Sequence, residues 1–481
     1  MRKRFEAQLT LGSTPIDQIE ILAKSRDEFP PFLRAMQYIY TNTEVNEQVY
    51  SLLESTICTK KKTGRPGMDL WSVFVLAGAR LCLNADYDRL HYHANTDGLL
   101  RKMLGVHDGI TPGRNFDRQT IIDNVSLLDD KTLREINQLI VSLGHKLVKK
   151  KEPEALRIKI DSFVTEANVH FPTDYNLLWD SGRKCVDVLN HLINHNSAYK
   201  KGWRKIEFWK RELKNSMLVL SRSTTDKSKN RQTRLLKATN EYLLIARKLS
   251  DKVRNIKQLN SSCLVEYCMI NELQYFLQML DKHIDLVDRR LLKDEKIPHE
   301  EKIFSIFETW VEWIFKGKAN NKVELGKRTC IATDQWHFIV DWHVANQQQD
   351  NQLLLSSIDR TITHFGKVSS CSGDKGFFSK IDIDVMELFD IKAFIPKKGK
   401  RSLADTIKEN EPEFIKARRK HNAIESNINE LEHRGLNRCP DRGLNGFHRY
   451  VGLAVIAYNL RRIGQILLNQ DIRENKRRQA A

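Results

Sequence analysis

Apolar residues recur every three or four positions through much of the first 150 residues, which predicts a series of amphipathic helices. One helix begins near Leu70 and reaches Leu81, and shorter ones are expected over residues 87–94 and 99–104. Three short helices with tight turns are typical of a helix-turn-helix unit, although a small helical bundle gives the same pattern. Further helices over 117–128 and 129–143 complete an all-α region, 1–150, that we expect to bind DNA.

This region contains two basic segments. KKKTGRPG, residues 60–67, is expected to form a basic turn. Lys149, Lys150 and Lys151 precede Pro153, and a lysine run followed by a helix breaker predicts a hinge between domains. A solvated linker and a phosphate contact are equally compatible with these lysines.

The segment 157–172, RIKIDSFVTEANVHFP, is predicted to begin as a short strand that carries Asp161 among apolar residues. An ionised carboxylate in such a place costs free energy unless a cation meets it. The alternative is an ordinary surface aspartate at a strand edge.

A helical composition then continues over residues 175–322, rich in Leu, Ile, Lys, Arg and Glu, with no proline between Pro172 and Pro298. Because strand-like segments flank this stretch, residues 176–321 are predicted to be a helical insertion between two strands.

From residue 327 the apolar spacing changes toward that of strands. Residues 328–334 and 337–345 predict a strand pair, followed by a helix from residue 350 to 360. A small-residue strand then leads to Asp374, another strand covers 391–399, and helix covers 416–469 with a Gly-punctuated break at 434–446. This alternation predicts an α/β layered core formed by residues 155–175 and 322–469, with a basic tail at 470–481.

Charge narrows the choice of partner. Lys and Arg total 79 against 61 Asp and Glu, a formal net charge of +18 with a pI near 9.4. This excess favours a polyanionic partner, with nucleic acid ahead of an anionic membrane; a merely soluble basic protein is the alternative.

Eight cysteines are scattered along the chain without a C-x-x-C pair, which argues against a zinc site and a disulfide framework. The basic N-terminus has no apolar run after it, so a signal peptide is not expected. The most apolar stretch, 451–468, is interrupted by Asn459, Arg461 and Arg462, and we expect no membrane association and a cytoplasmic protein.

One stretch of the insertion, residues 199–214, mixes cations with aromatic rings. Lys201, Arg204 and Lys205 stand next to Trp203 and close to two further aromatics, Phe208 and Trp209. Such a mixture suits phosphate contacts with stacking on bases or sugars. The rings can equally form the core of a helical hairpin, with the basic face still following DNA.

Three acids occupy places from which they can converge: Asp161 on the first strand, Asp374 at the end of a later strand and Glu425 on the following helix. Oxygen-only ligands suit Mg²⁺, and two such ions about 3.5–4 Å apart support phosphodiester cleavage. Asp334 and Asp341, in the strand pair, are alternative candidates for the second acid of this group. The Gly-bounded turn that holds Asp374 favours Asp374.

The motifs around these acids resemble those of bacterial insertion-sequence DDE transposases, of the ISNCY type. IDSFVTEANVHFP resembles the first-acid motif, SGDKGFFS the second, and HNAIESNINELEHRGLNRC the third. The resemblance implies a ribonuclease-H-like core and a transposase that cuts element ends and joins them to target DNA. It implies Asp161, Asp374 and Glu425 as ligands of two Mg²⁺ ions, with Mn²⁺ as a substitute. Its partners would be double-stranded DNA with terminal inverted repeats and a second copy of the chain, at the bacterial nucleoid.

The third motif departs from the family pattern. Related transposases often have Arg four residues before the Glu and Lys seven after it, where this chain has His421 and Glu432. Candidate DNA contacts are Lys375, His421, Arg434, Arg438, Arg442 and the three insertion cations. Glu166 and Asn168 are candidates for supporting the first acid. A DNA-binding protein derived from a transposase but without activity, or a nuclease that cuts without joining, would share these features.

Overall fold

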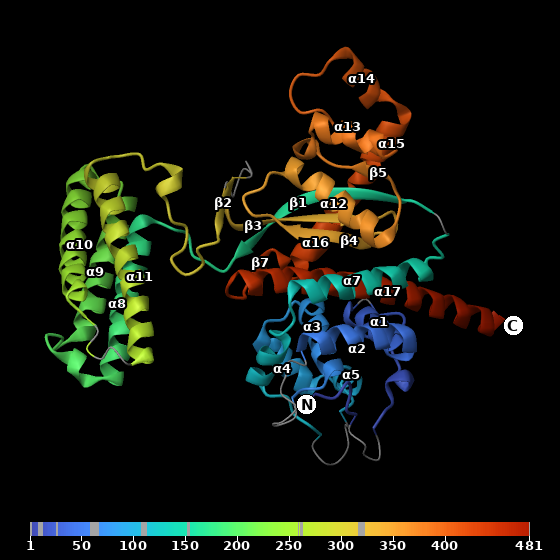
Figure 1. The fold of residues 1–481 in the computed structure, drawn as a ribbon, viewed down its shortest axis with the longest axis horizontal. Coiled ribbons are helices and arrows are strands. Elements are labelled where there is room, and N and C mark those ends of the chain that lie inside the picture. Colours follow the sequence, from blue (N-terminus) through green and yellow to red (C-terminus); the bar gives the residue numbers. More distant parts are fainter. Residues whose placement is uncertain are drawn as a thin grey trace. The chain divides into compact units, whose positions relative to one another are not determined.

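The computed structural model describes residues 2–7, 13–25, 27–57, 67–106, 113–151, 154–257, 259, 263–315 and 323–480. The chain forms two compact units (Figure 1). The first unit consists of Met1–Asn168 and Glu312–Ala481, and the second, here called the helical unit, is Val169–Val311. The basic turn expected at 60–66, Pro153 and Cys58 lie outside the described residues.

The described elements that precede the first strand are all helical. They are η1 Ile16–Gln18, α1 Phe29–Thr41, α2 Thr43–Ile57, α3 Leu70–Cys82, α4 Tyr87–Thr96, α5 Gly98–Met103, α6 Arg118–Val125 and α7 Asp130–Leu147. Aspartates cap several of them: the side chains of Asp69, Asp117 and Asp129 accept backbone N–H groups at the starts of α3, α6 and α7. The helices predicted from apolar spacing are therefore confirmed.

A mixed sheet forms the centre of the first unit. Its strands are β1 Leu156–Ala167, β2 Glu312–Phe315, β3 Val323–Thr333, β4 Ile339–Val344, β5 Val368–Ser372, β6 Lys392–Phe394 and β7 Arg438–Cys439. β1 pairs antiparallel with β3 and parallel with β5, β3 also pairs antiparallel with β2 and β4, and β5 pairs parallel with β6. β1 thus lies at the middle of the order β4-β3-β1-β5-β6.

Helices alternate with the later strands. They are α12 Asp350–Phe365, η5 Lys375–Phe377, α13 Lys380–Leu388, α14 Leu403–Asn410, α15 Pro412–His421, α16 Ala423–Leu431, η6 Glu432–Leu436 and α17 Leu444–Ala480. The predicted strand pair, the helix from residue 350 and the strand before Asp374 are confirmed. The chain is an α/β protein with much helix.

The long helix α17 is a core element of the first unit. It packs against α1, α3 and α7 (Figure 1), and 78% of its most apolar 18-residue window is buried. This is the one described helix long and apolar enough to cross a membrane, and its burial is typical of a core helix. Where Gly464 faces α1, a Cβ would collide with the carbonyl of Pro31, so the close approach of these helices requires glycine.

The polar residues that interrupt the apolar run of α17 tie it to the rest of the unit. Asn459 is fully buried: its Oδ1 accepts the Ile339 N–H at 2.9 Å, and its Nδ2 donates to Ile339 O at 2.9 Å and Asn137 Oδ1 at 2.8 Å. Arg461 is paired with Glu430. The next residue, Arg462, donates to the carbonyl of Trp336 at 3.1 Å.

The helical unit contains four long helices: α8 Asp174–His195, α9 Ile206–Thr225, α10 Arg231–Arg254 and α11 Leu264–Val287. Shorter turns are η2 Ser197–Lys200, η3 Asp288–Leu292 and η4 His299–Glu301. Leucines and aromatic residues from all four helices form its core, with Tyr242 and Leu249 fully buried. This unit occupies most of the insertion expected at 176–321.

Two expectations for secondary structure need correction. Helix was expected up to residue 322, but the described chain has no helix between η4 and residue 315, and Glu312–Phe315 forms β2. The aromatic and branched residues of β2 pair with β3, and tertiary pairing outweighs the helical composition averaged over the insertion. The break at 434–446 is confirmed, but it also contains β7, which pairs with the end of β1.

The expected division into domains stays a prediction. Residues 1–150 and the expected core both belong to the first compact unit. α7 is tied to the sheet, because His145 Nε2 lies 2.7 Å from Asp334 Oδ2 and Asn137 Nδ2 donates to Ile339 O at 3.1 Å.

Candidate active site

Asp161 lies at the middle of β1, opposite Ile331 of β3. The backbone N–H of Ser162 donates to its Oδ1 at 2.7 Å. The pKa of Asp161 is raised to about 7, chiefly by burial and then by the charges of Asp374, Asp350 and Glu425, against the lowering effect of the Ser162 N–H. The three acids predicted from the sequence therefore lie near enough for their charges to act on one another.

Asp374 and Glu425 reach this place from two other elements. Asp374 follows β5 and Gly373, and it caps η5 by accepting the backbone N–H of Gly376 at 2.7 Å. Glu425 lies in the first turn of α16, a helix that packs against β1. Both side chains are exposed, so the acids line an open surface rather than a closed core.

A fourth acid, Asp350, joins the group. The hydroxyl of Ser162 donates to its Oδ1 at 2.7 Å, and Arg328 Nη1 lies 2.6 Å from the same oxygen. A Cβ placed on Gly376 would lie 2.9 Å from Asp350 Oδ2 and from Asp374 Oδ1, so η5 brings these two carboxylates close together. The sequence reasoning treated residue 350 only as a helix start and missed this role.

The donor set fits a hard divalent cation. All the converging groups are carboxylates, and oxygen ligands are those that Mg²⁺ prefers. Burial, and after it the charges of the neighbouring acids, raises the pKa of Asp161, and a divalent cation would favour its ionised form. Among the described residues, ligand atoms gathered within 4.8 Å of one another occur at His195, Cys263 and Glu266 and not at these acids.

Comparison with protein families gives one match. Residues 286–460 match the family model Transposase DDE domain. The chain carries a transposase DDE domain. This confirms the resemblance to insertion-sequence DDE transposases. Comparison with curated proteins and with solved structures gives no match.

The matched stretch contains Asp374 and Glu425 but not Asp161. Asp161 joins them through the sheet, since β1 pairs with β3 and β5 although the helical unit separates β1 from both in sequence. The sheet topology thus brings the first-acid motif to the matched domain.

The two competing aspartates belong to buried networks that stabilise the fold. Asp334 is fully buried and accepts the N–H groups of Trp336 and Phe338, both at 2.9 Å. Asp341 accepts Arg360 Nε at 2.9 Å and Nη2 at 2.8 Å. With these partners, neither carboxylate is directed toward Asp161 as a ligand.

His421 and Lys375 differ in their surroundings. His421 ends α15, and its Nδ1 lies 3.2 Å from the hydroxyl of Ser372 at the end of β5. Burial, followed by the charges of Lys159 and Arg418, lowers the pKa of His421 to about 4, so its imidazole is neutral near pH 7. Lys375 is exposed directly after Asp374.

The three arginines after the third acid are not equivalent. Arg434 is half-buried, paired with Glu28, and donates to Cys82 O at 3.2 Å, so it holds η6 against the end of α3. Arg438 and Arg442 are exposed. Of the two residues proposed to support the first acid, Glu166 lies five residues along β1 from Asp161, a separation of about 17 Å at the rise of a strand. The other, Asn168, is exposed beyond the end of β1.

Within the helical unit, the basic and aromatic stretch divides between core and surface. Trp203 is buried and Trp209 packs against the core, whereas Phe208 is 42% exposed. Lys201, Arg204 and Lys205 are exposed. A hollow of about 820 Å³ lies here, lined by Trp179, Arg183, Lys205, Ile206, Glu207, Phe208, Lys210, Arg211 and Lys214.

Proposed function

We propose that the protein is a metal-dependent transposase that cleaves DNA at insertion-sequence ends and joins the freed 3′ ends to target DNA. The observation that carries the proposal is the interaction of three acidic side chains from the transposase motifs. They stand on a central strand, after a neighbouring strand and at a helix start, and two of them lie within the matched domain. The order β4-β3-β1-β5-β6, antiparallel and then parallel, supports a ribonuclease-H-like core.

Asp161, Asp374 and Glu425 would hold two Mg²⁺ ions, with Mn²⁺ as a substitute. Bound there, the ions would activate water or a 3′-hydroxyl and stabilise the leaving oxygen of the phosphodiester. Asp350 supports the group, because its carboxylate is fixed by Ser162 and Arg328 and adds negative charge beside the ligands.

Neighbouring residues position the DNA. Exposed Lys375 follows Asp374 and can contact a phosphate from the substrate. His421 is neutral near pH 7, so its expected contribution is to connect β5 with the α15–α16 junction through Ser372 rather than to supply charge. Arg438 and Arg442 remain proposed phosphate contacts, while Arg434 is proposed to hold the fold.

The hollow of the helical unit is a proposed DNA contact. It combines the exposed ring of Phe208 with cations, of which Lys205 and Lys214 are exposed. Such a surface favours a nucleic-acid backbone through charge and can stack against a base or sugar. Recognition of two element ends by two copies of the chain, at the nucleoid in the cytoplasm, completes the proposal.

The test uses DNA that carries the genomic sequences on both sides of the gene. Wild type and Glu425→Gln are compared for Mg²⁺-dependent cleavage, with DNA binding measured in parallel by gel shift. Loss of a metal ligand removes several kcal/mol of transition-state stabilisation, so cleavage should fall by at least about 10³-fold while binding persists. Glu413→Gln is the matched control, because Glu413, on the neighbouring helix α15, forms an exposed ion pair with Lys392 of β6.

The outcomes separate the alternatives. Cleavage with strand-transfer products supports transposition, whereas cleavage without them indicates a nuclease that does not join. Equal binding by both proteins, with no cleavage in Mg²⁺ or Mn²⁺, indicates a DNA-binding protein without activity. Cleavage retained by Glu425→Gln would contradict the assigned role of Glu425.

A further inference from the structure

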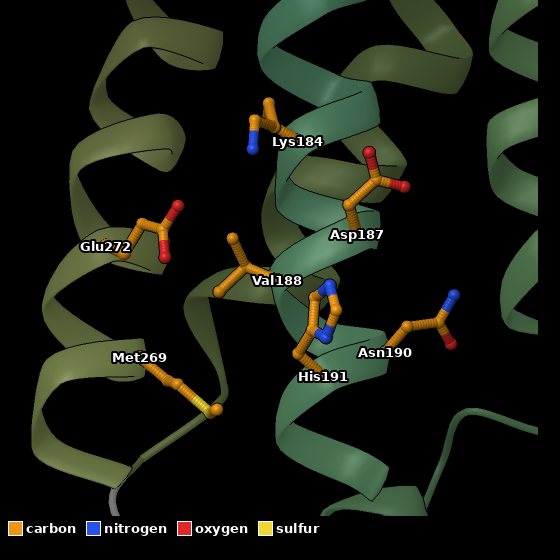
Figure 2. Close-up of a pocket in the computed structure, with 7 residues that line it drawn as sticks. All are labelled: Lys184, Asp187, Val188, Asn190, His191, Met269 and Glu272. Carbon is orange, nitrogen blue, oxygen red and sulfur yellow. The ribbon is translucent and has the colours of Figure 1, made fainter. Parts of the chain in front are cut away.

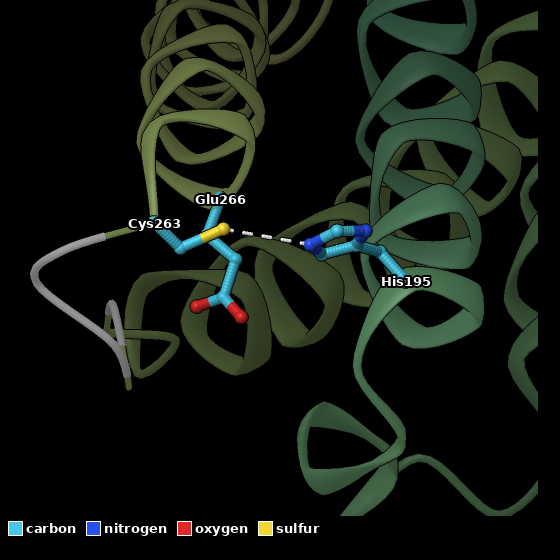
Figure 3. Close-up of side chains that lie close together, drawn as sticks. All are labelled: His195, Cys263 and Glu266. Carbon is cyan, nitrogen blue, oxygen red and sulfur yellow. Dashed lines mark hydrogen bonds between the residues drawn. The ribbon is translucent and has the colours of Figure 1, made fainter.

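A second group of potential metal ligands lies in the helical unit, apart from the carboxylates of the candidate active site. His195 ends α8, Cys263 caps the start of α11, and Glu266 lies in the first turn of α11 (Figure 3). One ligand atom from each residue lies within 4.8 Å of the others. The scattered cysteines argued against a zinc site, and this group was not predicted because its histidine and cysteine are 68 residues apart.

The geometry of the group matches a tetrahedral zinc ion. His195 Nε2 and Cys263 Sγ are 3.5 Å apart (Figure 3). Two ligands on one zinc ion, with Zn–N near 2.0–2.1 Å and Zn–S near 2.3 Å at the tetrahedral angle, are separated by about 3.5 Å. An ion can therefore be placed between them without moving the helices.

The third ligand is already oriented. Glu266 is 2% exposed, and its Oε1 accepts Asn196 Nδ2 at 2.9 Å while its Oε2 accepts the hydroxyl of Tyr199 at 2.6 Å. A carboxylate oxygen can accept more than one contact, so these two bonds fix the side chain without excluding a metal ion. Support of this kind around a ligand is typical of metal sites.

We propose that His195, Cys263 and Glu266 bind a zinc ion. Neutral imidazole, thiolate and carboxylate together carry two negative charges, which balance Zn²⁺, and the thiolate selects zinc over Mg²⁺. Binding releases the thiol proton of Cys263 to solvent. The ion connects the end of α8 with the start of α11.

Three protein ligands would leave the fourth position of the ion to water. A separate cavity of about 410 Å³ is lined by residues of α8 and α11: Lys184, Asp187, Val188, Asn190, His191, Met269 and Glu272 (Figure 2). His191 lies one helical turn before His195, so this cavity begins about 6 Å along the helix from the group.

The test uses Co²⁺ and Zn²⁺ with the full chain after chelator treatment. Co²⁺ bound to Cys263 should give a thiolate-to-cobalt charge-transfer band, which Zn²⁺ abolishes by displacement. Cys263→Ser should lose the band, while the matched control Cys268→Ser, an exposed cysteine on the same helix, should keep it. His191→Ala should keep the zinc affinity of the wild type, and Tyr199→Phe should lower it by about 10–100-fold.

The result of this metal-binding test does not depend on the proposed transposase activity. Asp161→Asn should lose Mg²⁺-dependent cleavage and keep the cobalt band, because the two sites differ in ligands. Zinc affinity that is equal in Cys263→Ser and Cys268→Ser, or no binding by the wild type, would overturn the zinc site. Circular dichroism of each variant confirms that the helices remain folded.

Discussion

Replacing Asp161 with Asn should make the metal-free protein more stable at neutral pH. The pKa of Asp161 is raised from 3.8 to about 7, first by burial and then by the neighbouring acids. Each tenfold change in an ionisation equilibrium corresponds to about 1.4 kcal/mol, so ionising this carboxyl in the folded state costs up to about 4 kcal/mol relative to the unfolded chain. Asn keeps the shape of the side chain and carries no charge.

The direction in which stability changes with pH follows from the proton that the folded state retains on Asp161. Below about pH 4 Asp161 is protonated in both states, and it does not affect stability. Between about pH 4 and pH 7 the folded state keeps a proton that the unfolded state has lost, so wild-type stability falls as the pH rises. Above about pH 7 both states are ionised and the full cost is present. The stability of Asp161→Asn should not fall in this way as the pH rises.

Equilibrium urea unfolding in chelator, followed by near-ultraviolet circular dichroism over this pH range, measures the difference. Mg²⁺ should then stabilise the wild type more than Asp161→Asn, because the ion offsets the charge that the variant lacks. Asp384→Asn is the control, since Asp384 is an exposed carboxylate on α13. Parallel pH profiles of wild type and Asp161→Asn would refute the reasoning.

Three further predictions concern the fold and the DNA contact. Asn459→Leu should cost about 2–5 kcal/mol, because buried groups of Ile339 and Asn137 lose their partner; a loss below about 1 kcal/mol in urea unfolding would contradict this. Gly464→Val should lower the thermal midpoint far more than a substitution at exposed Gln465, because α1 and α17 must separate. Lys205→Ala with Lys214→Ala should reduce the slope of log affinity against log salt by up to about two, and an unchanged slope would exclude the hollow as a phosphate contact.

Much of the first unit could be predicted from local sequence. Apolar spacing located α3, α6 and α7, because each helix carries its own buried face. The strand around Asp161 and the turn at Asp374 were also predicted, since alternation and glycine placement act over a few residues. β7 was not predicted, because its two residues become a strand only when they reach the end of β1.

The roles of side chains whose partners are distant in the sequence could not be predicted from it. Asp350 enters the acid group because Ser162 and Arg328, from two strands, fix its carboxylate. His421 stays a predicted phosphate contact, but burial and the charges of Lys159 and Arg418 lower its pKa to about 4, so that it is neutral near pH 7. Arg434 was expected among DNA contacts, whereas Glu28 and a backbone carbonyl hold it within the fold. Apart from Arg418, none of these partners is near in sequence.

The separation of β1 from its partners has a consequence for the order of synthesis. β1 ends at Ala167 and β3 begins at Val323, so residues 168–322 are made before the antiparallel partner exists, and the parallel partner β5 comes later still. At 5–20 residues per second, the ribosome needs roughly 8–31 s for these 155 residues. During that interval the strand that carries Asp161 has both edges unpaired while the helices of Val169–Val311 can already fold as they emerge. The acid group can therefore assemble only after the chain has been synthesised as far as Glu425. A product that ends before Glu425 lacks the complete group.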